Sequence, residues 1–171
     1  MKFRAIKVPG EIPASCAFRL LSMDAALKGL ISTSANEGNL SVRCGGGFVI
    51  KGAGSRLTLM KRDDISHVLS ANENDFSLSY SGALPSSESF MHHLIYRVVP
   101  ASAILHFHDA PLLSKKLSFP SVPKLPYGSP ELAKAVSSKA KAGKIVLMEG
   151  HGSVIWAEKE GELIPLLKSI L

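Results

Sequence analysis

Five apolar residues near the start of the chain recur at helical spacing. They are separated by four, three, four and three positions: Cys16, Leu20, Met23, Leu27 and Leu30. This spacing places every member of the set on one face of an amphipathic helix. The pattern therefore predicts a helix over residues 14–30 with a buried apolar face.

Short apolar runs further along the chain predict strands. Residues 40–44 and 48–50 flank three consecutive glycines, a pattern typical of a β-hairpin. Residues 57–70 predict a short helix or a turn that enters a strand. The other predicted strands are residues 76–80, 103–108, 145–148 and 153–156.

Helix-entry signals predict three more helices. One begins near Ser86 and ends before Pro100, one begins at Ser129, and one runs from about residue 158 to Leu171. Between them, residues 111–126 are broken by prolines and predict a loop with at most a short helix at its start. Strands flanked by helices predict a single α/β layered domain over the whole chain.

Composition and charge restrict the class of protein. The 171 residues include 20 Lys and Arg against 14 Asp and Glu, a net charge of +6. The basic residues are scattered and lack interleaved aromatic residues, so nucleic-acid binding is not favoured, and the charge fits a phosphorylated small substrate equally well. No apolar run approaches the roughly 20 residues that span a bilayer. Residues 1–13 lack the apolar core of a signal peptide, so we expect no membrane association and a cytoplasmic location.

The chain contains two cysteines, Cys16 and Cys44. Two are too few for a disulfide framework or for a zinc site made of four thiolates. Cys16 belongs to the apolar face of the first predicted helix. We therefore interpret Cys16 as a small buried hydrophobic residue.

The segment His106-Phe107-His108 is the first candidate for chemistry. Residues two apart in a strand project to the same face, so both imidazoles are expected on one side, with Phe107 in the core. Two such nitrogens suit a divalent metal, although two histidines on a wet strand face are also common. His151, which lies between two glycines after a predicted strand, is a third candidate ligand or a plain turn histidine.

An acidic residue and two glycine loops supply further candidates. Glu88 opens a predicted helix, where the free N–H groups of the first turn favour a carboxylate even without a function. With Ser86 and Ser87, the same helix start is also a potential anion site. The loops at residues 38–39 and 52–54 can present backbone N–H groups to a phosphate, or can simply be turns.

Taken in order, these segments resemble the class II aldolase/adducin family. The matching blocks run in register from about residue 27 to about residue 156: Gly38-Asn39-Leu40-Ser41, a hairpin that ends at Gly54, Pro85-Ser86-Ser87-Glu88, His106-Phe107-His108 and Glu149-Gly150-His151-Gly152. The resemblance implies a single three-layer domain, in which helices flank a central, largely antiparallel sheet.

The resemblance also implies which residues form the site. His106, His108 and His151 would hold one Zn²⁺ per subunit, or another divalent metal, and Glu88 would complete the coordination and act as general base. Bound zinc would stabilise an enediolate as a Lewis acid. The phosphate pocket would be lined by Gly38, Asn39, Gly54, Ser86 and Ser87.

The activity implied by the resemblance is that of a carbon–carbon lyase. Such an aldolase would cleave a phosphorylated ketose, such as fuculose 1-phosphate, into a three-carbon ketone phosphate and an aldehyde. The alternatives are an epimerase or dehydratase of the same family acting on a sugar phosphate, and a non-catalytic interaction module of the adducin type. Four retained metal ligands favour catalysis, because a scaffold has no need of converging imidazoles. The resemblance further implies a homotetramer.

One segment departs from the family pattern, and the roles of two further residues have two interpretations each. Family aldolases carry a proton-donating tyrosine after the His-x-His strand, whereas residues 111–126 contain none and Tyr127 is the nearest. Lys51 either adds charge for a phosphate or is a solvated residue at a strand end. His92 either orients Glu88 from the next helical turn or lies on the helix surface.

Overall fold

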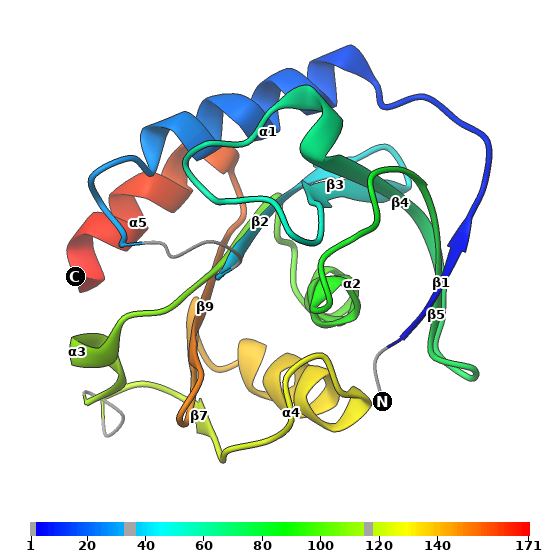
Figure 1. Ribbon diagram of the computed structural model, residues 1–171. Coiled ribbons are helices and arrows are strands. Elements are labelled where there is room, and N and C mark those ends of the chain that lie inside the picture. Colours follow the sequence, from blue (N-terminus) through cyan, green and yellow to red (C-terminus); the bar gives the residue numbers. More distant parts are fainter. Residues whose placement is uncertain (1–2, 33–36, 115–117) are drawn as a thin grey trace.

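The computed structural model describes residues 3–32, 37–114 and 118–171, which fold around one sheet (Figure 1). Its strands are β1 (Arg4–Lys7), β2 (Asn39–Cys44), β3 (Gly47–Lys51), β4 (Ile65–Asn72), β5 (Ser77–Gly82), β6 (Ala103–Phe107), β7 (Ser121–Val122), β8 (Ile145–Met148) and β9 (Gly152–Ala157). Across the sheet they follow the order β1-β5-β4-β3-β2-β6-β9-β8-β7. The strands β2 and β6, which carry Asn39 and His106, are therefore neighbours, and β9, which follows His151, lies on the other side of β6.

The inner part of the sheet is antiparallel and its two ends are parallel. β2 pairs with β3 and β6, and β9 pairs with β6 and β8, all in antiparallel fashion. At the ends, β1 runs parallel to β5 and β7 runs parallel to β8. The prediction of a largely antiparallel sheet is confirmed. The two edge strands were not predicted, because β1 is mostly exposed and β7 has only two residues.

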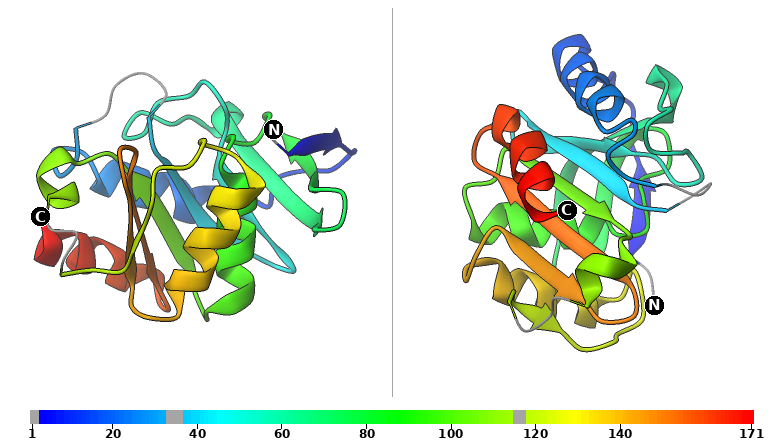
Figure 2. Two further views of the ribbon diagram at one scale, coloured as in Figure 1. Left: turned by 90° about the horizontal axis from the view of Figure 1, so that it is seen from below. Right: turned by 90° about the vertical axis from the view of Figure 1, so that its left-hand side faces the viewer.

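Helices cover both faces of the sheet (Figure 2). α1 (Ala14–Ala26) and α5 (Leu163–Ile170) lie on one face, whereas α2 (Ser89–Val98) and α4 (Pro130–Ala140) lie on the other. Each face has its own apolar core, and successive residues of β6 alternate between the two cores, as a pleated strand requires. This arrangement confirms the predicted three-layer α/β domain.

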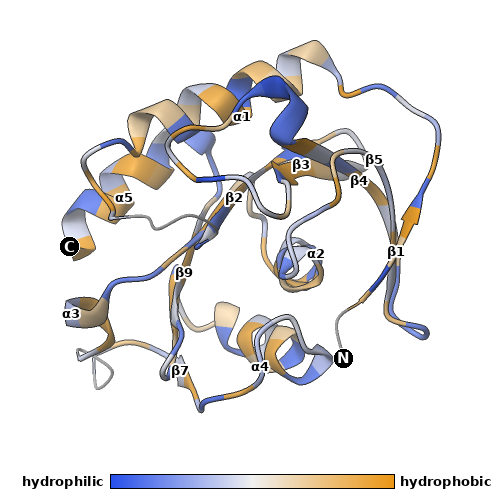
Figure 3. Cartoon of the chain, in the orientation of Figure 1, coloured by the Kyte–Doolittle hydropathy of each residue, from blue (hydrophilic) through white to orange (hydrophobic). Residues whose placement is uncertain are grey.

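The helices are amphipathic, as expected for helices that bury one side. Figure 3 shows apolar and hydrophilic residues side by side along α1, α2 and α4. A short helix, α3 (Ala110–Leu113), follows β6. Within the described ranges, no helix is long and apolar enough to cross a membrane.

Most predicted elements are present, with shifted ends. The hairpin forms as predicted, with Cys44 opposite Gly47. α1 ends at Ala26 rather than at residue 30, because the chain turns near Gly29, whose φ of 79° favours glycine. α5 begins after a short 3-10 turn and therefore later than the predicted residue 158.

Cys16 and Cys44 form a disulfide that the sequence analysis did not predict. Cys16 lies on α1, Cys44 lies at the end of β2, and both are buried. The burial predicted for Cys16 is confirmed, but its interpretation as simply a small hydrophobic residue left out the bond to Cys44. Helical spacing identifies the buried face of α1 without identifying the strand beneath it, so the approach of Cys44 depends on the tertiary fold.

Candidate active site

Two histidines lie at the end of the central strand β6. Between them Phe107, the last residue of the strand, is 1% exposed and belongs to the core. The Nε2 atoms of His106 and His108 lie 3.2 Å apart. The prediction that both imidazoles share one side is confirmed, although His108 lies just beyond the strand.

His151 joins this pair from the turn between β8 and β9. Its ring centroid lies 4.9 Å from that of His106 and 5.1 Å from that of His108. One nitrogen of each ring lies within 4.8 Å of the other two. Three imidazoles from two distant parts of the sequence thus converge, and three protein ligands are what a catalytic zinc site needs.

Gly152 leaves the space in which the imidazoles meet. A Cβ atom at this position would lie 2.9 Å from a ring carbon of His106 and 2.9 Å from one of His108. It would also lie 2.6 Å from the carbonyl oxygen of Phe107, which is backbone and cannot move easily. The first residue of β9 therefore has to be glycine for the rings to keep these positions.

Glu88 lies against the imidazoles and is 4% exposed. Its Oε1 lies 2.9 Å from Nε2 of His151, and its Oε2 lies 3.1 Å from Nε2 of His106. The amide of Asn39 donates to Oε2 over 3.2 Å. Burial raises the pKa of Glu88, but His106 and the hydrogen bonds from His151 and Asn39 outweigh burial and lower the pKa to about 2. Glu88 is therefore ionised at neutral pH.

The hydrogen bonding of His106 leaves a lone pair facing this carboxylate. Burial lowers the pKa of His106 to about 4 in spite of the nearby Glu88, so the ring is neutral at pH 7. Its Nδ1 donates to the carbonyl oxygen of Ser153 over 3.0 Å, so Nε2 is the acceptor nitrogen. That nitrogen and the Glu88 carboxylate, 3.1 Å apart, repel unless a cation or a proton lies between them. The donor set therefore fits a divalent metal ion.

The predicted phosphate-binding residues line the same cavity as the imidazoles. Ala53 donates its amide to the carbonyl of Leu84 over 2.7 Å, and Gly52 pairs with Pro85, so two distant loops meet here. The second loop leads into the N-terminus of α2, where the helix dipole favours an anion. The cavity measures about 540 Å³, and the predicted residues that line it are Gly38, Asn39, Gly54, Ser86, Ser87, Glu88, His106, His108 and His151. The structure thus brings all the predicted site residues together.

Lys51 and Tyr127 also line this cavity. Lys51 is 1% exposed, and its ammonium donates to the carbonyl of Ser55 over 2.6 Å, so its interpretation as a solvated residue is wrong. Burial lowers the pKa of Lys51, although acidic neighbours oppose this shift. Tyr127 is 58% exposed at the rim, with its ring parallel to that of His151 at a centroid distance of 6.4 Å. In the sequence, the only indication of Tyr127 as a site residue was its position directly after the proline-broken loop.

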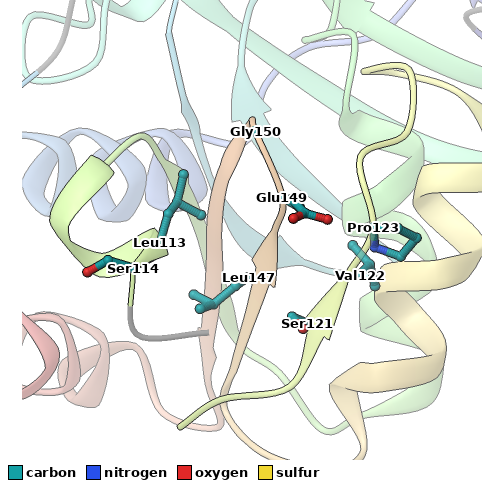
Figure 4. Close-up of a pocket in the computed structure, with 8 residues that line it drawn as sticks. All are labelled: Leu113, Ser114, Ser121, Val122, Pro123, Leu147, Glu149 and Gly150. Atoms are coloured by element: carbon teal, nitrogen blue, oxygen red, sulfur yellow. The ribbon is translucent and has the colours of Figure 1, made fainter. Parts of the chain in front are cut away.

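A second cavity, of about 510 Å³, lies between α3, β7 and the end of β8 (Figure 4). Its lining residues are Leu113, Ser114, Ser121, Val122, Pro123, Leu147, Glu149 and Gly150. Figure 4 shows the Glu149 carboxylate beside Val122 and Pro123. As far as the described residues show, this cavity shares none of the candidate metal-binding or phosphate-binding residues.

Fold and site together define an α/β domain with a three-histidine, one-carboxylate cluster beside an anion pocket. The family model described as Class II Aldolase and Adducin N-terminal domain matches residues 20–114, more than half of the chain. The chain therefore belongs to the class II aldolase and adducin family. The resemblance inferred from the sequence is confirmed.

Curated relatives with known activities match parts of the chain. The fluorothreonine transaldolase of Streptantibioticus cattleyicolor is 32% identical over 87 residues, 50% of this chain and 14% of that protein. The 5-methylthioribulose-1-phosphate/5-deoxyribulose-1-phosphate aldolase of Escherichia coli O45:K1 (strain S88 / ExPEC) is 29% identical over 135 residues, 68% of this chain and 61% of that protein. The L-fuculose phosphate aldolase of Haemophilus influenzae (strain ATCC 51907 / DSM 11121 / KW20 / Rd) is 28% identical over 152 residues, 78% of this chain and 68% of that protein. The chain thus spans less than two thirds of the first two relatives.

Solved structures share the fold along nearly the whole chain. The L-fuculose-1-phosphate aldolase of Thermus thermophilus superposes with a TM-score of 0.71 at 22% identity, covering 92% of this chain and 90% of that one. Another L-fuculose 1-phosphate aldolase superposes with a TM-score of 0.76 at 20% identity, covering 93% of this chain and 82% of that one. At these identities the similarity establishes the architecture.

Proposed function

We propose that this chain is a zinc-dependent aldolase that cleaves a phosphorylated ketose, such as fuculose 1-phosphate, into a three-carbon ketone phosphate and an aldehyde. The carrying observation is the convergence of three imidazole nitrogens within 4.8 Å beside the ionised, buried Glu88. Membership of the class II aldolase and adducin family and the aldolases among the relatives support a lyase.

His106, His108 and His151 would hold the metal, one ion per subunit, with Glu88 completing the ligand set. When bound, a divalent ion supplies Lewis-acid stabilisation of the enediolate left by carbon–carbon cleavage. The chain prepares these groups in advance, because the Ser153 carbonyl holds the proton of His106 on Nδ1 and leaves Nε2 free to coordinate.

Glu88 is the proposed general base. It is ionised at neutral pH and enclosed in the cavity, so it can accept the proton of the substrate hydroxyl as the carbon–carbon bond breaks. Asn39 donates to one carboxylate oxygen and to the hydroxyl of Ser86 over 3.1 Å, which links the base to the phosphate side of the cavity. A substrate held at its phosphate is thereby positioned relative to the base.

The proposed phosphate pocket combines backbone amides with hydroxyl groups. Its residues are Gly38, Asn39, Gly54, Ser86 and Ser87, and the two serines come just before the N-terminus of α2. Gly38 has a φ of 68°, and a Cβ there would lie 2.6 Å from the carbonyl oxygen of His106, so this loop has to pass close to the metal side. The buried ammonium of Lys51 adds positive charge to the pocket wall.

Tyr127 is the proposed proton donor to the leaving aldehyde. Its ring is parallel to that of His151 at the rim of the cavity, and the residue is 58% exposed. A phenol hydroxyl can give its proton to the leaving group only when it lies within hydrogen-bond reach of the substrate. Tyr127→Phe should therefore lower kcat with little change in KM for the phosphorylated substrate.

The same proposal extends to the assembly of the molecule. Residues 1–171 would act as one class II aldolase domain, working in the cytoplasm as a homotetramer. The exposed rim residue Tyr127 supports association, because a second subunit would enclose the open side of the cavity. Light scattering of the purified protein tests this point, and an active monomer would contradict it.

A product assay tests the function directly. The zinc-loaded protein is incubated with L-fuculose 1-phosphate and, in parallel, with 5-deoxyribulose 1-phosphate, and the aldehyde and the three-carbon ketone phosphate are quantified. His106→Ala should abolish product formation, whereas His93→Ala is the matched control, because His93 contacts the exposed Glu73 outside the cavity. Isomerisation or loss of water without cleavage would indicate an epimerase or dehydratase. Protein that binds no stoichiometric metal would indicate an adducin-type interaction module.

A further inference from the structure

His92 is a buried histidine beside the candidate site that the proposed reaction does not use. It lies four residues after Glu88 on α2, where residues of this spacing are neighbours on one helix face. Its side chain is completely buried, so its interpretation as a helix-surface residue is wrong. The charge of Glu88 acts on the ring and raises its pKa, but burial dominates and lowers the pKa to about 3. His92 is therefore neutral at pH 7 and carries one ring proton.

Ser41 and Tyr96 determine which nitrogen of His92 carries that proton. The hydroxyl of Ser41 lies 2.7 Å from Nδ1 of His92 and 2.9 Å from the hydroxyl of Tyr96. Burial raises the pKa of Tyr96 beyond its usual range, so the phenol keeps its proton. If Tyr96 donates to Ser41, Ser41 can donate to Nδ1, so both hydroxyl protons find an acceptor and the ring proton lies on Nε2. The opposite direction would leave the Tyr96 proton without an acceptor in this chain of bonds.

The Nε2–H group of His92 is then a buried hydrogen-bond donor without an acceptor in the described part of the chain. Among the described residues, Nε2 of His92 has no hydrogen-bond partner. A buried donor without an acceptor costs about 1–3 kcal/mol, so its retention beside an ionised carboxylate requires an explanation. The negative charge of Glu88, one helical turn earlier, acts on the His92 ring and opposes the lowering of its pKa by burial.

Glu88 needs such a donor once the histidines engage a metal. In the structure the carboxylate contacts Nε2 of His151, Nε2 of His106 and the amide of Asn39. The two imidazole nitrogens are the atoms that the proposed metal site uses, so neither can also donate a proton to the carboxylate. Of the three contacts, only the Asn39 amide remains available as a donor.

We propose that His92 is a positioning residue for Glu88: Ser41 and Tyr96 hold it as the Nε2–H tautomer, and this N–H receives the carboxylate when Glu88 gives up its contacts with His106 and His151. The inference rests on the proposed function of the site. Its role is to keep the base aimed within the cavity during turnover, and His92 itself touches neither substrate nor metal.

The first test is spectroscopic and does not depend on activity. In the metal-free protein, nitrogen-15 NMR of the imidazole rings should show His92 as the Nε2–H tautomer, and Ser41→Ala should remove this preference. Addition of zinc should shift the His92 Nε2–H resonance, because one Glu88 oxygen then completes the metal ligand set while the other is free to accept this hydrogen bond, and Glu88→Gln should weaken that shift. An Nδ1–H tautomer, or a resonance that zinc leaves in place, would overturn the proposal. The expected resonance shift together with an absence of aldolase activity would contradict the proposed function and would still support the contact between His92 and Glu88.

The second test separates positioning from a packing role. A glutamine side chain can place its amide nitrogen near the position of Nε2, whereas asparagine places its polar atoms near that of Nδ1 and retains only the contact with Ser41. His92→Gln should keep kcat within about threefold, whereas His92→Asn should lose about tenfold in kcat, the value of one hydrogen bond to a charged group, with KM little changed. His93→Asn is the matched control on the same helix, and melting temperatures show whether both variants fold. If His92→Asn is as active as His92→Gln, or more active, the proposal is wrong.

Discussion

The two sides of the cavity are built by different means. The metal side consists of side chains at the end of β6, at the turn before β9 and at the start of α2. Glu88 contacts both His106 and His151; Glu88 and His106 are buried, and His151 is half-buried. The phosphate side consists of loops in which glycines and backbone amides form the surface, as at Gly38 and Gly54. The comparison indicates that residue type decides the chemistry on the first side, whereas backbone conformation decides it on the second. Substitutions should therefore act very differently on the two sides.

Removal of a ligand from the metal side should have the largest effect. His106→Ala leaves two imidazoles, fewer than a catalytic zinc site needs, and the several kcal/mol of transition-state stabilisation from the metal corresponds to a loss of about 1,000-fold in kcat/KM. Elemental analysis should show loss of stoichiometric zinc, while the affinity for inorganic phosphate stays within about twofold because the loops are intact. Equal loss of zinc and phosphate binding would show that the two sides are not independent.

Gly152→Ala should damage the metal side without removing any ligand. The new Cβ would lie 2.9 Å from ring carbons of both His106 and His108, so the rings have to separate. Displaced ligands should cost about 10- to 100-fold in zinc affinity, measured by competition with a chelating dye. Gly161→Ala is the control, because a Cβ at Gly161 meets no atom within 4 Å. Wild-type zinc affinity in the Gly152→Ala protein would contradict the crowding argument.

Acid should lower the free energy of unfolding through buried histidines in and beside the metal side. Burial lowers the pKa of His92 to about 3 and that of His106 to about 4, so between these values and pH 6.5 the unfolded chain takes up protons that the folded chain does not. The free energy of unfolding of the metal-free protein should therefore fall by about 1.4 kcal/mol per pH unit for each of these histidines as the pH drops below 6.5. Glu88, with its pKa lowered to about 2, adds a further loss only below pH 4.5.

Urea titrations at several pH values measure this dependence. His92→Asn removes one histidine whose pKa is lowered to about 3, so the slope of stability against pH should be less steep by about 1.4 kcal/mol per pH unit between pH 6.5 and 4.5. The same slope in the variant and in the wild type would show that His92 does not take up a proton on unfolding.

Lys51→Met should produce the smallest effect and should act on the phosphate side. Loss of a buried positive charge from the pocket wall should raise KM for a phosphorylated substrate by about tenfold, the value of one charge-assisted hydrogen bond, with kcat within about twofold. Lys144→Met is the control, because Lys144 lies on the surface beside Glu158 and Glu162. Initial-rate kinetics measure both quantities. A fall in kcat at constant KM would place Lys51 with the reacting atoms and would break the division between the two sides.

The metal side was largely predictable from the sequence, whereas what surrounds it was not. Alternation along a strand was enough to place His106 and His108 on one side. The local sequence made His151 and Glu88 candidates, and the family resemblance joined all four residues in one site. Burial of Lys51 and His92 was not predictable, because both depend on loops and helices packed around them. The disulfide of Cys16 and Cys44 escaped prediction for the same reason, since local spacing does not reveal which elements meet in space.

The most direct test of the central claim is the zinc K-edge X-ray absorption spectrum of the zinc-loaded protein. The account predicts one zinc ion per chain with scattering from three imidazoles at about 2.0–2.1 Å. A site with fewer than three imidazoles, or a spectrum that is unchanged by His151→Ala, would contradict it.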